Sequence, residues 1–124
     1  MSTPGSQSRF LQGVFPFMGK GIYEAVLVEH DLELVVPEGY QARVVYVRLG
    51  NCSDSLIYLT LTSDGRPIRH FPVEPQGAFH IPLVLQEAHP AGTRITFLLA
   101  AERGVSGSVI LDAGIELEPT IPSP

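Results

Sequence analysis

The sequence predicts an all-β fold: an antiparallel β-sandwich or jelly roll of seven to eight short strands, with an extended N-terminal arm. Apolar and polar residues alternate with a period of two, which is typical of half-buried strands. Turn-forming Gly, Pro and Asp separate these stretches at intervals of about ten residues. No stretch shows an apolar helical face with capping residues. The chain has 124 residues, 44% of them hydrophobic, which suits one domain with a single core.

Three parts follow one another along the chain. We expect an extended arm over residues 1–20, a sandwich domain over 21–118 and a proline-rich tail over 119–124. No period of 2 or 3.6 persists in the arm, and soluble monomers avoid exposing apolar surface, so we expect the arm to dock on a partner. The residues expected to bind that partner are Phe10, Leu11, Val14, Phe15 and Phe17.

The first half of the domain contains four strand-like stretches. Residues 22–28 and 32–36 are expected to form a strand pair or one bent strand. Apolar and polar residues alternate over 42–49, although Arg43 falls on the face where Val45 places apolar residues. They alternate strictly over 56–62. Asp64 and Gly65 follow at once and supply the positive φ angles of a tight hairpin turn.

The second half contains four more. Prolines at 67, 72, 75 and 82 mean that strands near 68–71 and 78–81 must be short or lie at a sheet edge. Residues 94–101 and 109–117 alternate over longer stretches. The alternation predicts one core between two sheets, made of Val45, Val47, Ile57, Leu59, Leu61, Ile95, Phe97, Leu99, Val109 and Leu111.

Side chains that could carry chemistry do not form a known pattern. His70, Glu74 and His80 have the right types for a metal site, but a cupin would show a close His-x-His pair, and His80 lies out of phase with its apolar neighbours. Cys52 is the single cysteine, which excludes an internal disulfide and a multi-thiolate site. Ser106 lacks a nucleophile elbow. We therefore expect no catalytic residue, no metal, no cofactor and no small-molecule substrate.

Charge and targeting limit the partners and the location. The formal net charge of −5 argues against nucleic acid. The first 20 residues lack the features of a secretory signal and no apolar run is long enough to cross a membrane, so we expect neither secretion nor membrane binding. Tyr46 and Tyr58 should lie on the outward faces of adjacent strands and stack, with Tyr40 beside a turn. Without Trp, these few aromatic residues give little support to a lectin.

The organisation of the chain resembles that of the decoration proteins, also called auxiliary or cement proteins, of tailed-phage capsids. The resemblance lies in a small acidic sandwich with a docking arm, an arginine-rich composition consistent with a heat-adapted source, and the segments VPEGY at 36–40, leading into 42–49, and AGTRITF at 91–97. It implies a non-enzymatic homotrimer on the outer capsid surface of a virion, bound to the major capsid protein. No functional residue is carried over by motif.

Two other functions stay open. The first is a sandwich-type binding module or accessory subunit, located in the cytoplasm, that recognises a protein or carbohydrate through its loops. The second is a cupin-type enzyme, which the spacing of His70 and His80 disfavours. A stable trimer in solution would favour the decoration protein, and a monomer would favour the binding module.

Overall fold

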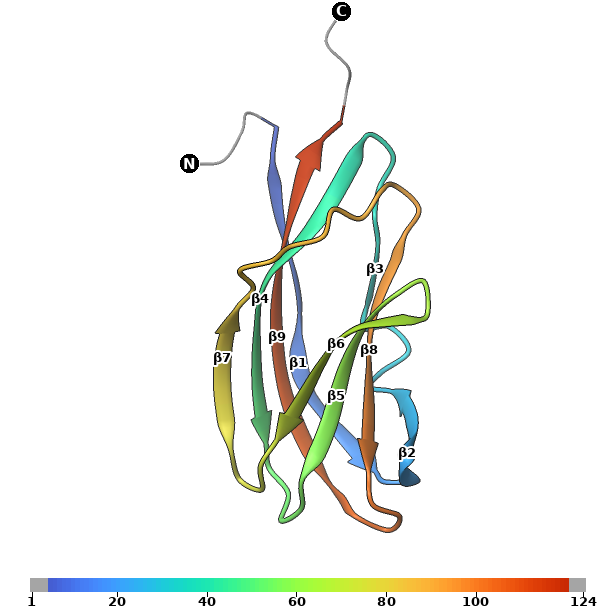
Figure 1. Ribbon diagram of the computed structural model, residues 1–124, viewed down its shortest axis with the longest axis vertical. Helices are drawn as coiled ribbons and strands as arrows, with labels where there is room; N and C mark the ends of the chain where they lie inside the picture. Colours follow the sequence, from blue (N-terminus) through green and yellow to red (C-terminus); the bar gives the residue numbers. More distant parts are fainter. Residues whose placement is uncertain (1–4, 121–124) are drawn as a thin grey trace, which may run out of the picture.

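Residues 5–120 form nine antiparallel strands, which stack as two sheets (Figure 1). This is a computed structural model, and it describes residues 5–120. The strands are β1 (Gln7–Met18), β2 (Gly21–Leu27), β3 (Glu33–Val35), β4 (Tyr40–Asn51), β5 (Ile57–Ser63), β6 (Arg66–Val73), β7 (Ala78–Pro82), β8 (Arg94–Ala101) and β9 (Ser106–Pro119). The described residues contain no helix, so the predicted all-β sandwich is confirmed.

Each sheet is built from strands that are distant in the sequence. Sheet A has the order β1-β9-β4-β7, and sheet B has the order β2-β8-β5-β6, with β3 also paired to β8. The stretches 22–28 and 32–36 were expected to form a pair or one bent strand; they became β2 and β3, which both pair with β8. The edge strands are therefore β1 and β7 in sheet A, and in sheet B they are β6 on one side and β2 and β3 on the other.

The core lies between the two sheets and follows the predicted alternation. Every predicted core residue except Val45 is buried. Val45 is half-buried because the register between β4 and β9 shifts between Val44 and Tyr46. This bulge places an extra residue on β4, so Ala42 and Val44 face the core before it and Val47 and Leu49 after it. The bulge also explains why Arg43 breaks the apparent phase.

Prolines mark the edges of the sheets. Pro16 lies in β1, Pro67 and Pro72 lie in β6, and Pro82 ends β7. All three strands are edges, where a residue without an N–H group costs no ladder hydrogen bond on the solvent side. The prediction that strands near 68–71 and 78–81 lie at an edge is therefore confirmed.

The hairpin between β5 and β6 has the predicted turn. Asp64 and Gly65 adopt φ angles of 52° and 81°, the left-handed pair that matches the twist of the two strands. The Asp64 carboxylate accepts a hydrogen bond of 2.8 Å from the backbone N–H of Arg94, which ties the turn to the start of β8.

The N-terminal segment departs from the prediction. Gln7–Met18 is strand β1 and pairs with β9 over its whole length, so this part of the expected arm belongs to the sandwich. Leu11 is buried, and Phe15 and Phe17 pack against the core. The period of two was hidden because apolar side chains occupy both faces of β1: Phe10, Val14 and Met18 point the other way. β1 is the ninth strand, in addition to the eight strands expected from the sequence.

The first two residues of the predicted C-terminal tail, Pro119 and Thr120, are bound to the sandwich. Pro119 is the last residue of β9, and the backbone N–H of Thr120 donates a 2.9 Å hydrogen bond to the carbonyl of Gly39. Residues 121–124 of the predicted tail, like residues 1–4 of the predicted arm, lie outside the described residues.

Candidate binding surfaces

The outer face of sheet A carries an apolar stripe along its β1 edge. Phe10, Val14 and Met18 are 53%, 64% and 59% exposed. Val14 pairs in register with Ile110 of β9, which is itself 44% exposed. We call these four residues the β1 stripe. Val14, Ile110 and Met18 lie on one side of the polar residue Gln12, and Phe10 lies on the other. A soluble monomer would normally keep this sheet face polar.

The predicted arm residues divide between the two faces of β1. Phe10 and Val14 point outward and are available to a partner. Leu11, Phe15 and Phe17 point toward the core and are part of the chain's own packing. Strand geometry forces this division, because neighbouring side chains alternate between faces. Met18 and Ile110 complete the outward set, although the sequence predicted neither of them as a partner-binding residue.

The rest of the outer face of sheet A is organised in rows across the strands. Tyr46 pairs with Gly114, which pairs in turn with Phe10, so aromatic side chains flank a glycine. A Cβ atom at Gly114 would lie 2.0 Å from the Tyr46 ring, so the ring requires glycine there. The next row contains Arg48 and Asp112, whose charges are 3.9 Å apart.

Tyr46 connects these rows. Its hydroxyl donates a 3.1 Å hydrogen bond to Asp112, and its ring contacts His80 edge-on with the centroids 5.3 Å apart. Burial, followed by the hydrogen bond to Asp112, raises the pKa of Tyr46. The phenol therefore stays protonated and keeps donating. This row contributes polar specificity beside the apolar stripe.

The outer face of sheet B contains a groove of about 430 Å³. It is lined by residues of β2, which lies at the edge of the sheet, and of β8, β5 and β6, which follow it in the strand order. Its walls and floor are mainly apolar, and they come from four strands: Ile22, Tyr23 and Ala25 of β2, Leu98 and Ala100 of β8, Tyr58 and Thr60 of β5, and Pro67 and His70 of β6. Its volume falls within the ~300–1,000 Å³ of typical ligand sites.

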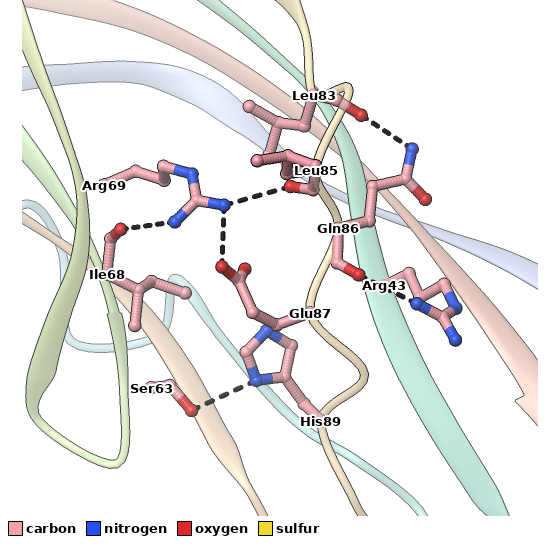
Figure 2. Close-up of polar contacts among 9 residues, drawn as sticks. All are labelled: Arg43, Ser63, Ile68, Arg69, Leu83, Leu85, Gln86, Glu87 and His89. Carbon is pink, nitrogen blue, oxygen red and sulfur yellow. Dashed lines mark hydrogen bonds and ion pairs between the residues drawn. The ribbon is translucent and has the colours of Figure 1, made fainter.

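The loop between β7 and β8, residues 83–93, connects sheet A to sheet B, and Figure 2 shows polar contacts of its residues. Arg43 of β4 donates a 2.8 Å hydrogen bond to the carbonyl of Gln86 from the side of sheet A. Arg69 of β6 donates to the carbonyl of Leu85 at 3.0 Å and forms a 2.6 Å ion pair with Glu87 from the side of sheet B. The loop therefore joins the two sheets.

His89 holds the same loop from inside. It is buried, exchanges two backbone hydrogen bonds of 2.8 Å with Ala42, and its Nδ1 lies 3.2 Å from the hydroxyl of Ser63 (Figure 2). Burial lowers its pKa, and Arg43 and Arg69 act in the same direction, while Glu87 and Asp64 oppose them. Ser63, His89 and Glu87 resemble a hydrolytic triad in residue type, but the buried Ser63 hydroxyl offers a substrate no approach. The cluster is structural.

The other residues singled out in the sequence lie apart. His70 is on the outer face of sheet B, and His80 is on the outer face of sheet A, where it pairs with Arg48. Within residues 5–120, no three His, Cys, Asp or Glu side chains gather where they could share a metal ion. Tyr46 and Tyr58 face outward, but they belong to different sheets, so the predicted stacking between them is wrong.

Comparisons with known proteins identify no family. No family model matches this chain, and no curated protein matches it. Among solved structures, an exo-β-1,3-galactanase from Phanerochaete chrysosporium aligns at 11% identity with a TM-score of 0.40. The insecticidal delta-endotoxin Cry8Ea1 from Bacillus thuringiensis aligns at 14% identity with a TM-score of 0.38.

These alignments include 91% and 94% of this chain, but only 29% of the galactanase and 18% of the toxin. The chain thus spans less than a third of either protein, and similarity at this level carries no argument about function. Separately, residues 5–120 include no helix of the length and apolarity needed to cross a membrane.

Proposed function

We propose that this chain is a non-enzymatic structural protein that associates with other protein subunits through the outer face of sheet A. The observation that carries this proposal is the β1 stripe. β1 is apolar on both faces: the inner face packs on the core, and the outer face leaves Phe10, Val14 and Met18 more than half exposed. A strand with two apolar faces is typical of one that is covered on both sides.

The edge position of β1 supports a protein as the partner. An edge strand leaves alternate backbone N–H and C=O groups unpaired, and another chain can pair with them. β1 is 12 residues long, and Pro16 is its single proline, so it has little of the protection that edge strands usually carry. A protein partner can cover the apolar stripe and also pair with this edge.

The arrangement of the sheet face adds selectivity. The apolar pairs at Phe10 and Val14 lie on either side of a row with Gln12, Asp112 and Arg48. The positive Arg48 and the negative Asp112 favour a partner that places opposite charges against them, and they disfavour a partner that places like charges there. The resemblance to capsid decoration proteins names the particular assembly that we propose, a homotrimer seated on the outer surface of a capsid.

The proposal is tested by the oligomeric state of the full chain. Size-exclusion chromatography with light scattering should give a trimer. A variant with Phe10→Ser, Val14→Thr and Met18→Thr should give a monomer, because its outer face is polar while the inner face of β1 is unchanged. Its thermal unfolding, followed by circular dichroism, should stay cooperative, which shows that the loss of association is not a loss of folding.

A matched control replaces exposed apolar residues elsewhere. Val84 and Leu85 are 91% and 77% exposed in the β7–β8 loop, and a Val84→Ser, Leu85→Ser variant should remain a trimer. A parent chain that is monomeric at its highest soluble concentration would contradict the proposal. So would a control variant that dissociates while the β1 variant stays assembled, because the interface would then lie at the loop.

A further inference from the structure

The groove on sheet B owes one of its walls to an irregularity in β2. Gly21 pairs with Ala101 and Val26 pairs with Leu99, so four residues of β2 lie opposite Ala100 alone. The extra residues leave the ladder as a bulge, and Ile22, Tyr23 and Ala25 from this bulge line the groove. Bulges often redirect side chains beside binding sites. Here the bulge leaves Tyr23 92% exposed at the rim.

The floor and the opposite wall have small and polar side chains. Ala100 of β8 pairs with Tyr58 of β5, and Leu98 pairs with Thr60, so a small residue beside each large one keeps the floor hollow. Thr60 pairs across β5 and β6 with His70, and its hydroxyl lies 3.2 Å from His70 Nδ1. This contact fixes the imidazole at the side of the groove opposite β2.

The lining is neutral in charge and mixed in polarity. None of the nine lining residues is Asp, Glu, Lys or Arg. An anionic ligand would therefore find no cation in the groove, and the net charge of −5 would repel it. A cationic ligand would find no carboxylate in the lining. The hydroxyls of Tyr23, Tyr58 and Thr60, together with the His70 imidazole, can donate and accept hydrogen bonds beside an apolar surface.

From this complementarity we infer that the groove binds a neutral saccharide. A pyranose ring combines an apolar C–H face with hydroxyl groups around its edge, which matches tyrosine faces beside hydroxyl and imidazole groups. The rings of Tyr23 and Tyr58 would pack on the C–H face, and Thr60 and His70 would meet the hydroxyls. The site lies on the sheet opposite the β1 stripe, so the inference does not depend on the proposed assembly function.

Nuclear magnetic resonance titration of the full chain tests this inference. The probes are the neutral disaccharides lactose, cellobiose, maltose and chitobiose. At least one of them should shift the amide signals of Tyr58, Thr60, His70 and Leu98 in a saturable way. Tyr23→Ala should weaken that binding by about fivefold, which corresponds to roughly 1 kcal/mol for the lost contact with the aromatic ring. Tyr23→Phe keeps the ring and should bind within about twofold of the parent chain.

Two controls test where the sugar binds and which sugar chemistry the groove prefers. The variant with Phe10→Ser, Val14→Thr and Met18→Thr alters the opposite sheet face and should bind the disaccharide as the parent does, even if the assembly proposal fails. A hyaluronan tetrasaccharide, which carries a carboxylate on every second ring, should bind more weakly than the best neutral disaccharide.

Several outcomes would overturn the inference. These are the absence of shifts with all four disaccharides, undiminished binding by Tyr23→Ala, and tighter binding of the hyaluronan fragment. Shifts of the groove signals on dilution without sugar would also overturn it, because a second copy of the chain would then be the occupant.

Discussion

Among single residues, Asn51 shows how one polar side chain organises a chain reversal. It is buried at the end of β4. Its amide N–H groups donate to the carbonyls of Ser55, Val73 and Glu74 at 2.8–3.1 Å, and its carbonyl accepts from the backbone N–H and the hydroxyl of Ser53. The side chain thus ties the end of β4 to the turn before β5 and to the end of β6.

Asn51→Ala should lower the free energy of unfolding by about 2 kcal/mol or more, because each buried group left without a partner costs roughly 1–3 kcal/mol. Chemical denaturation measures this directly. Asp54→Ala provides the control, since Asp54 is exposed and accepts one side-chain hydrogen bond of 3.3 Å from Gln76; its effect should stay within about 0.5 kcal/mol. An Asn51 variant as stable as this control would show that water replaces the lost bonds.

His89 makes the stability of the chain depend on pH. Its pKa is lowered in the folded state, first by burial, so the unfolded chain takes up a proton at a higher pH than the folded chain does. The free energy of unfolding should therefore be highest above the ordinary histidine pKa of about 6.5, and should fall as the pH drops below that value. The melting temperature of the parent chain should decrease between about pH 7.5 and pH 5.5.

His89→Gln keeps a polar side chain but cannot titrate, so its melting temperature should vary less over the same range. The other three histidines, His30, His70 and His80, are present in both chains, so the comparison isolates the effect of His89. Glu87 titrates below this window, because the hydrogen bond from Arg69 and other favourable contacts outweigh the effect of burial and lower its pKa. Equal pH dependence of the two chains would show that Ser63 and Ala42 hold His89 equally well in both protonation states.

Among the strands, β1 is the one whose role changed most between sequence and structure. A chain that starts at Gly21 loses the partner of β9 along 12 residues and the packing of Leu11, Phe15 and Phe17. Each of these side chains stabilises the fold by roughly 1.5–3 kcal/mol, and a domain of this size has a net stability of about 5–15 kcal/mol. The shortened chain should therefore be largely unfolded and should show no cooperative melting transition.

Circular dichroism melting of the two chains measures this loss. A chain that starts at Ser6 keeps all of β1 and should melt as the parent does. Persistence of the parent's melting transition in the chain that starts at Gly21 would mean that β1 is dispensable for folding. β1 would then have to be regarded as an arm that happens to pair with β9.

The sandwich as a whole presents two different surfaces in opposite directions. The outer face of sheet A has the apolar β1 stripe beside a charged row, and the outer face of sheet B has the neutral groove. The core and the β7–β8 loop hold the two sheets together. Occupation of one face leaves the other accessible, so the proposed assembly through sheet A and the proposed ligand binding on sheet B would not compete.

Most of the strands, the tight turn at Asp64 and Gly65 and nearly all of the core could be predicted from the amino-acid sequence. These features depend on local patterns: alternation of period two, positive φ angles and the exclusion of proline from inner strands. The edge positions of β6 and β7 followed from their prolines in the same way. A short window of residues contains all the information that such predictions need.

The assignment of each strand to a sheet required the folded structure, and the candidate surfaces depend on that assignment. β1 could not be recognised from its own residues, because a strand that is apolar on both faces has no alternation. The phase change at Val45 depends on a bulge against β9, and the groove depends on a bulge against β8. Register between strands far apart in the chain is set by how two sheets pack together, and no single segment encodes it.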